Sequence, residues 1–223
     1  MAGTMVTFPS NGHECSGFLA LPETPGPAVI VLQEFWGLNA DIKDIAQRFA
    51  GEGFLALAPD MYHGQVATEP DEARKLAMEL QLDRAAQDLK GAVSYLRGHD
   101  SSSPSKVGSV GFCMGGSLSL YLASIEPTEA AVTYYGAPRY PEFKALDIQS
   151  PVQAHFAGQD PDTTERGTKM VEDLKAAGRD VEMYVYEGAH HSFFNKTRPE
   201  AHHAEAAELS WQRTLSFFRK HLS

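Results

Sequence analysis

Ser109-Val-Gly-Phe-Cys-Met-Gly-Gly-Ser117 is the stretch of sequence that decides the fold of this chain. An apolar run that predicts a β-strand ends at Phe112, and a segment that predicts a helix begins at Met114. Glycines stand two positions before and two positions after Cys113, where larger side chains would collide with neighbouring backbone in so tight a turn. The pattern Gly-x-nucleophile-x-Gly therefore predicts a strand–turn–helix unit with Cys113 at its tip in a strained conformation.

The predicted position of the Cys113 thiol favours a catalytic role. A side chain at this turn projects over the carboxyl edge of the sheet, where open α/β sheets bind their ligands. The N-terminus of the following helix stabilises a thiolate through its dipole, and the amide of Met114 points to where an oxyanion would form. A free cysteine between glycines is often only a small buried residue, but the strand–turn–helix setting favours a nucleophile.

A cysteine nucleophile requires a base and an acid, and in folds with this turn both follow it along the chain, the acid first. The apolar strand predicted over residues 152–157 leads into Asp160, which is our candidate for the acid. Asp162 is the alternative, although it also suits a cap of the helix that starts near Thr163. Either carboxylate would otherwise be an ordinary loop residue.

The base is expected after the last predicted strand, residues 181–186. Two adjacent histidines, His190 and His191, follow that strand, and the pattern alone does not choose between them. His202 and His203 are expected on the solvated face of a terminal helix.

Strands and helices alternate on both sides of this segment. After an N-terminal hairpin around Asn11-Gly12, the alternation predicts a mostly parallel sheet with helices on both faces, in one domain spanning residues 1–223. The run Ala28-Val-Ile-Val-Leu32 is typical of a strand buried on both faces. Strands are expected over residues 5–8, 15–21, 28–32, 54–58, 107–112, 130–135, 152–157 and 181–186, and helices over 39–49, 70–80, 82–96, 114–124, 161–177 and 199–221.

Composition narrows the classes of function. The 223 residues carry a formal net charge of −10, which argues against binding to nucleic acid or to an anionic membrane. Two cysteines are too few for a disulfide framework, and no spacing of metal-ligating residues predicts a metal or other cofactor. We see neither a signal peptide nor an apolar run of the roughly 20 residues that a membrane helix needs, so we expect a cytoplasmic protein.

Six motifs in order resemble the dienelactone hydrolase family, and the resemblance covers nearly the whole chain. It implies an α/β-hydrolase fold. The motifs are Val29-Ile-Val-Leu-Gln-Glu-Phe-Trp-Gly-Leu-Asn39, Ala58-Pro-Asp-Met-Tyr62, Val110-Gly-Phe-Cys-Met-Gly-Gly116, Tyr134-Tyr-Gly136, Gly158-Gln-Asp160 and Ala189-His-His-Ser-Phe193.

The resemblance also implies roles for individual residues. It selects His191 over His190 as the base, because the family's histidine directly precedes a small residue and a phenylalanine. It assigns Glu34 to a contact with the resting thiol, and a carboxylate at the end of so apolar a strand is costly unless it is paired. Glu34 would otherwise simply emerge into solvent. The implied catalytic residues are Cys113, Asp160, His191 and Glu34, with an oxyanion hole formed by the amides of Phe35 and Met114.

The sequence departs from the family at the arginines that hold a substrate carboxylate. Asn195 stands where one arginine is expected, and Arg74 is a candidate to replace another. Trp36, Phe193 and Phe194 are large and apolar, which suggests a more hydrophobic substrate.

The resulting hypothesis is a hydrolase that cleaves a small-molecule ester or lactone through a Cys-His-Asp triad and an acyl-enzyme. Two alternatives stay open. One is a general carboxylesterase or thioesterase with the same triad, and the other is a hydrolase-like module that binds a ligand without turning it over.

Overall fold

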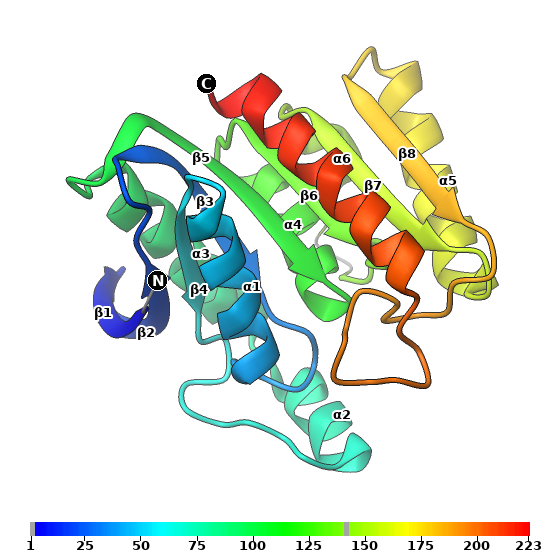
Figure 1. Cartoon of the computed structure of the whole chain (residues 1–223), viewed down its shortest axis with the longest axis horizontal. Coiled ribbons are helices and arrows are strands. Elements are labelled where there is room, and N and C mark those ends of the chain that lie inside the picture. The colour runs from blue at the N-terminus through cyan, green and yellow to red at the C-terminus, as the bar shows by residue number, and fades with distance from the viewer. Residues whose placement is uncertain (1–2, 141–142) are drawn as a thin grey trace.

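The computed structural model describes residues 3–140 and 143–223, and its centre is an eight-stranded sheet (Figure 1). The strand order is β1-β2-β4-β3-β5-β6-β7-β8, in which β1 and β2 form an antiparallel hairpin and β2 pairs antiparallel to β4. The pairs from β4 to β8 are parallel. The strands are β1 Thr4–Ser10, β2 His13–Ala20, β3 Gly26–Leu32, β4 Leu55–Pro59, β5 Ser102–Phe112, β6 Ala130–Tyr134, β7 Val152–Ala157 and β8 Val181–Tyr186.

Helices cover both faces of this sheet, as the sequence predicted. Helices α1 and α6 pack on one face, and α3, α4 and α5 pack on the other (Figure 1). The helices are α1 Ala40–Gly51, α2 Pro70–Glu79, α3 Leu82–Arg97, α4 Met114–Ile125, α5 Pro161–Ala176 and α6 Ala204–Leu222, with a short 3₁₀ helix η1 over Ala145–Asp147.

Strand β3 explains why the sheet is covered on both sides. Its apolar residues alternate between the two cores, with Val29 and Val31 facing α1 and α6, and Ile30 and Leu32 facing α3 and α4. All four are fully buried. A strand with one polar face would leave half of these side chains in water, so the continuous apolar run requires two layers of helices.

The last helix begins later than predicted. The expected helix over residues 199–221 is observed as Ala204–Leu222. The His203 side chain accepts a hydrogen bond from the Ala206 amide at 3.3 Å and so caps the helix. His202 and His203 therefore precede the helix, rather than lying on its solvated face.

The turn between β5 and α4 is as tight as the glycines predicted. Cys113 adopts a φ of 54°, a left-handed conformation that is strained for a residue with a side chain. A Cβ added to Gly111 would collide with the carbonyl of Gly115, and one added to Gly115 would collide with the carbonyl of Leu32. The turn can therefore form only if both positions lack side chains.

Substituting Gly111→Ala tests this constraint. We expect a loss of about 3 kcal/mol in the free energy of unfolding, because the added methyl group must displace backbone. In a chain of this length, that loss lowers Tm by roughly 6–12 °C in a circular-dichroism melt. Gly98→Ala is the matched control, since the nearest atom to its added Cβ lies 3.5 Å away. Equal Tm values for the two variants would contradict the argument.

Candidate active site

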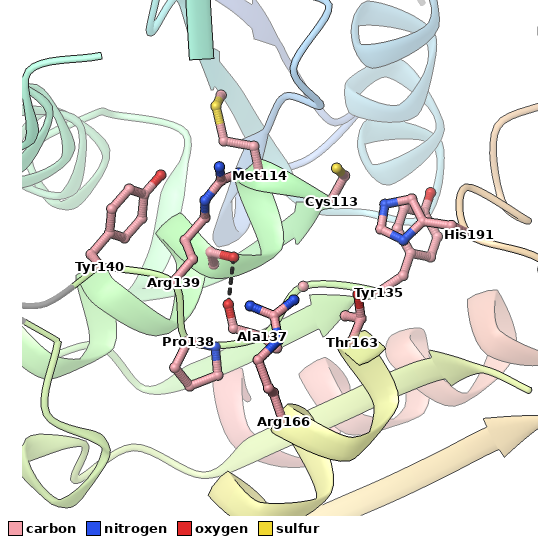
Figure 2. A pocket seen from close by; sticks show the side chains of 12 residues that line it. Cys113, Met114, Tyr135, Ala137, Pro138, Arg139, Tyr140, Thr163, Arg166 and His191 are labelled. Carbon is pink, nitrogen blue, oxygen red and sulfur yellow. Dashed lines mark hydrogen bonds between the residues drawn. The ribbon is translucent and has the colours of Figure 1, made fainter. Parts of the chain in front are cut away.

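Cys113 stands at the carboxyl edge of the sheet, between the last residue of β5 and the first residue of α4. Its amide donates a hydrogen bond to the carbonyl of Tyr134, at the end of the neighbouring strand β6, at 3.0 Å. The side chain is partly exposed and lines two cavities. Figure 2 shows the sulfur at the rim of the larger cavity, on the side where His191 lies.

His191 and Asp160 come together from the ends of two adjacent strands. Asp160 follows β7 and occupies the N-cap position of α5, while His191 lies in the turns after β8. The His191 Nδ1 and Asp160 Oδ2 atoms are 2.5 Å apart. His190 and Asp162, the alternatives at each position, are both exposed.

The charges of His191 and Asp160 follow from the hydrogen bond between them. Burial lowers the pKa of His191, but the hydrogen bonds to Asp160 and Cys113 outweigh burial and raise that pKa to about 10. Burial alone would raise the pKa of Asp160, and the hydrogen bond from His191 reverses this and lowers it. At neutral pH the pair is therefore an imidazolium and a carboxylate.

Glu34 lies at the end of β3 in a buried polar network. Its side chain is 3% exposed, and burial raises its pKa. The Tyr135 hydroxyl donates to Oε1 at 3.2 Å, and the Asn195 amide donates to Oε2 at 2.7 Å. Among the residues that the structure describes, no hydrogen bond joins Glu34 to Cys113. The carboxylate is paired, as its setting required, but with partners other than the expected thiol.

The two amides expected to form an oxyanion hole flank Cys113. Met114 is the first residue of α4, so its N–H has no carbonyl to bind within the helix. Phe35 follows Glu34 at the end of β3 and lines the smaller cavity beside Cys113 and His191. Within residues 3–140 and 143–223, neither N–H has a hydrogen-bond acceptor.

The two cavities share Cys113, His191 and Arg139 in their linings. The larger one, of about 630 Å³, also contains Arg166. Figure 2 shows the guanidinium groups of Arg139 and Arg166 extending into it. The smaller one, of about 420 Å³, is lined by Phe35, Arg74, Ala77, Met78, Ser192, Arg198 and Ala201. Among the described lining residues neither cavity has an aspartate or glutamate, so both walls are cationic.

The structure separates the predicted substrate-binding residues. Arg74 lines the smaller cavity and pairs with Asp71. Trp36 stacks on Phe35, with ring centroids 4.6 Å apart, and lies outside the described lining of both cavities.

Phe193 and Asn195 turn inward rather than toward a cavity. Phe193 is fully buried among Tyr134, Tyr135 and Tyr186. Asn195 is 3% exposed, and its amide group is occupied by Glu34 and Thr197. Neither side chain is among the described residues that line the two cavities, and their predicted contacts with a substrate stay a prediction.

Three residues of the site were not singled out by the sequence patterns. Tyr135 has a φ of 39° just after β6, and its ring lies 5.0 Å from that of His191. The adjacent tyrosines before Gly136 were a signal, although they gave no role. Arg139 and Arg166 lie in a loop and on an exposed helix surface, where a single cation carries no sequence signal.

A second Cys-His-Asp group, Cys15, His63 and Asp88, lies outside these cavities. Cys15 is fully buried. Burial, together with the charge of Asp88, raises the pKa of its thiol to about 12. This thiol is therefore unsuited to attack a substrate. Separately, no described helix is long and apolar enough to span a membrane.

Comparisons with known proteins agree with this fold. The family model described as "Dienelactone hydrolase family" matches residues 15–222. "Protein usf" of Aquifex pyrophilus is 37% identical, over 99% of this chain and 100% of that protein. A protein of Aquifex aeolicus with the name "Putative carboxymethylenebutenolidase" is 34% identical, over 99% of each chain. A solved dienelactone hydrolase-like promiscuous phosphotriesterase from metagenomic libraries superposes with a TM-score of 0.88 at 26% identity, covering 100% of this chain and 99% of that one.

These likenesses extend over nearly the full length of each protein, and the family match includes both β5 and the segment that carries His191. The chain therefore belongs to the dienelactone hydrolase family of the α/β-hydrolase superfamily and is a hydrolase of carboxylic ester or lactone bonds.

Proposed function

We propose that Cys113 is the nucleophile of a Cys113-His191-Asp160 triad that hydrolyses a small ester or lactone through an acyl-enzyme. One observation carries the proposal. Asp160 holds the His191 ring at 2.5 Å, and His191 and Cys113 line the same cavity, which is large enough for a small substrate. A nucleophile beside a base that is held by an acid is the arrangement that this chemistry needs.

The proposed reaction starts from a Cys113 thiolate and a His191 imidazolium. The Cys113 thiolate attacks the substrate carbonyl, and the amides of Phe35 and Met114 stabilise the oxyanion. As the C–O bond of the ester breaks, the His191 imidazolium gives its proton to the leaving oxygen. Neutral His191 then takes a proton from water, which attacks the thioester carbonyl. The carboxylic acid leaves, and the thiolate and the imidazolium are restored.

Glu34 is proposed as a positioning residue. It accepts a hydrogen bond from Tyr135, whose ring packs against His191, and one from Asn195 in the turn that follows His191. The buried carboxylate thus connects the end of β3 to Tyr135, which packs against His191, and to Asn195, in the turn that follows His191.

The substrate is proposed to carry a carboxylate or a similar anion. Arg139 and Arg166 line the larger cavity, and neither has a carboxylate partner within ion-pair distance among residues 3–140 and 143–223. Guanidinium groups bind carboxylates with paired hydrogen bonds. The relatives named carboxymethylenebutenolidase point to the same kind of substrate. The cationic wall therefore replaces the family arginine whose place Asn195 occupies.

Replacing the nucleophile is the first test. We expect Cys113→Ala to lower kcat/KM for a 4-nitrophenyl ester by at least about a thousandfold, because no other group can form the acyl-enzyme. Cys113→Ser should keep part of the activity, since the turn accommodates either atom. Cys15→Ala is the matched control and should keep the activity of the parent. Unchanged turnover in Cys113→Ala would defeat the proposal, and a chain with no ester turnover at all would favour the ligand-binding alternative.

The charge state of His191 gives a pH test. Its pKa is raised from 6.5 to about 10, so the imidazolium persists through neutral pH and is lost as the pH rises. We expect kcat/KM to fall along an alkaline limb. Asp160→Asn removes the hydrogen-bonded carboxylate, which lowers the pKa of His191 and moves that limb to lower pH. Asp162→Asn, an exposed neighbour, should leave the limb in place. The same limb in the parent and in Asp160→Asn would count against Asp160 as the acid.

A pair of substrates tests the cationic wall. 4-Nitrophenyl succinate and 4-nitrophenyl butyrate differ by a terminal carboxylate, so their kcat/KM ratio isolates recognition of the anion. We expect Arg166→Ala to lower this ratio by about tenfold, which corresponds to one charge-assisted hydrogen bond. Activity toward the butyrate should stay within about twofold of the parent. An unchanged ratio in both Arg166→Ala and Arg139→Ala would indicate a general carboxylesterase.

A further inference from the structure

A second cluster of reactive side chains lies on the opposite side of β4 from the candidate active site. It combines a thiol, two imidazoles and a carboxylate, contributed by residues that are far apart in the sequence. The residues are His13 and Cys15 on β2, His63 in the turn after β4, and Asp88 on α3. We propose that this cluster is a binding site for a zinc ion, independent of the hydrolytic site.

The donor atoms are already close together. One ligand atom from each of Cys15, His63 and Asp88 lies within 4.8 Å of the others. His63 Nε2 is 3.2 Å from Asp88 Oδ2. Ligand atoms about 2.0–2.1 Å from a tetrahedral zinc ion are roughly 3.3 Å apart, so this pair has the spacing of two zinc ligands.

Asp88 Oδ2 provides an independent indication of a missing partner. The Asp88 side chain is 1% exposed, and Oδ2 accepts no hydrogen bond despite its closeness to His63. A carboxylate oxygen without a hydrogen bond is costly in so dry a setting. A bound cation would satisfy this oxygen.

The other oxygen of Asp88 orients the carboxylate. Oδ1 accepts a hydrogen bond from Ser10 Oγ at 2.6 Å and lies 2.9 Å from His13 Nε2. His13 and Cys15 are two residues apart on one strand, so their side chains share a face. His13 and Ser10 therefore support the carboxylate from outside the ligand set, and the proposed ligands are Cys15, His63 and Asp88.

The Asp60 side chain fixes the backbone turn that carries His63. Asp60 Oδ1 accepts from the Tyr62 amide at 3.1 Å, and Asp60 Oδ2 accepts from the Gly64 amide at 2.6 Å. The His63 side chain is 30% exposed, which leaves a route for an ion to enter.

The chemistry of the donors favours zinc over other common cations. A thiolate and imidazoles are ligands that zinc prefers, whereas calcium and magnesium take oxygen ligands almost exclusively. Three protein ligands leave the fourth position of a tetrahedral zinc ion to a water molecule. Such a site would join the N-terminal hairpin, the turn after β4 and α3 at one point.

Arg84 opposes metal binding in the arrangement observed. Its Nη2 lies 3.4 Å from His63 Nδ1, and a guanidinium can only donate. Binding a metal at Nε2 requires a proton on Nδ1, so the two groups would then repel. Arg84 is exposed and must move aside when the ion binds.

Zinc titration of the full chain tests the proposal. The Cys113→Ser variant is used as the parent, so that the catalytic thiol cannot contribute. After chelation and dialysis, calorimetry with Zn²⁺ alone should show one equivalent bound, and Co²⁺ should give a thiolate-to-metal charge-transfer band. Bound zinc should also raise Tm, because it binds only the folded chain.

Three further variants test where the ion binds. His63→Gln should weaken zinc binding by at least about 100-fold, while His190→Gln, an exposed histidine outside the cluster, should leave it unchanged. Arg84→Gln should tighten binding by up to about tenfold, since an amide oxygen accepts from Nδ1. Circular dichroism checks that each variant is folded, and ester hydrolysis by the same substitutions made with Cys113 intact should match the unsubstituted chain. Absence of stoichiometric binding, or full binding in His63→Gln, would overturn the site.

Discussion

The structure depends on a backbone contact that leaves no room for side chains. Where β5 turns into α4, Gly111 lies against Gly115, which in turn lies against the carbonyl of Leu32 at the end of β3. This contact draws the helix N-terminus up to the sheet edge and forces Cys113 into a left-handed conformation. The sulfur is therefore held by backbone geometry, and the dipole of α4 and the unpaired amide of Met114 are aligned with it without any further interaction.

Much of this could be predicted from the sequence, because its determinants are local. The glycines around Cys113, the apolar run of β3 and the alternation of strands and helices each depend on neighbours within a few positions. The fold prediction is confirmed by the eight-stranded sheet. The sequence could also predict that Asp160 and His191 lie together, because residues that follow parallel strands meet at one edge of a sheet. Their roles stay a prediction, although the structure brings them into contact.

Other features depended on how distant segments pack, and no local pattern contained them. Phe193 has the composition expected of a substrate pocket, yet the turn after β8 directs it into the core. Asn195 pairs with Glu34, which is 161 positions away in the sequence. The cluster around Asp88 is likewise built from segments up to 78 positions apart. Pairings of this kind follow from the topology of the sheet, and composition or spacing does not encode them.

The order of the strands also sets the distance between the residues of the candidate active site. The strand that leads to Cys113 and the strand that leads to Asp160 are two places apart in the sheet, a separation of about 10 Å. Strand β6 occupies the gap, and Tyr135 at its end packs against the imidazole that bridges it. Interstrand hydrogen bonds fix that separation, so it does not depend on the loops above the sheet edge. Those loops are consequently free to diverge in length and to remodel the cavities without altering the alignment of the reacting groups.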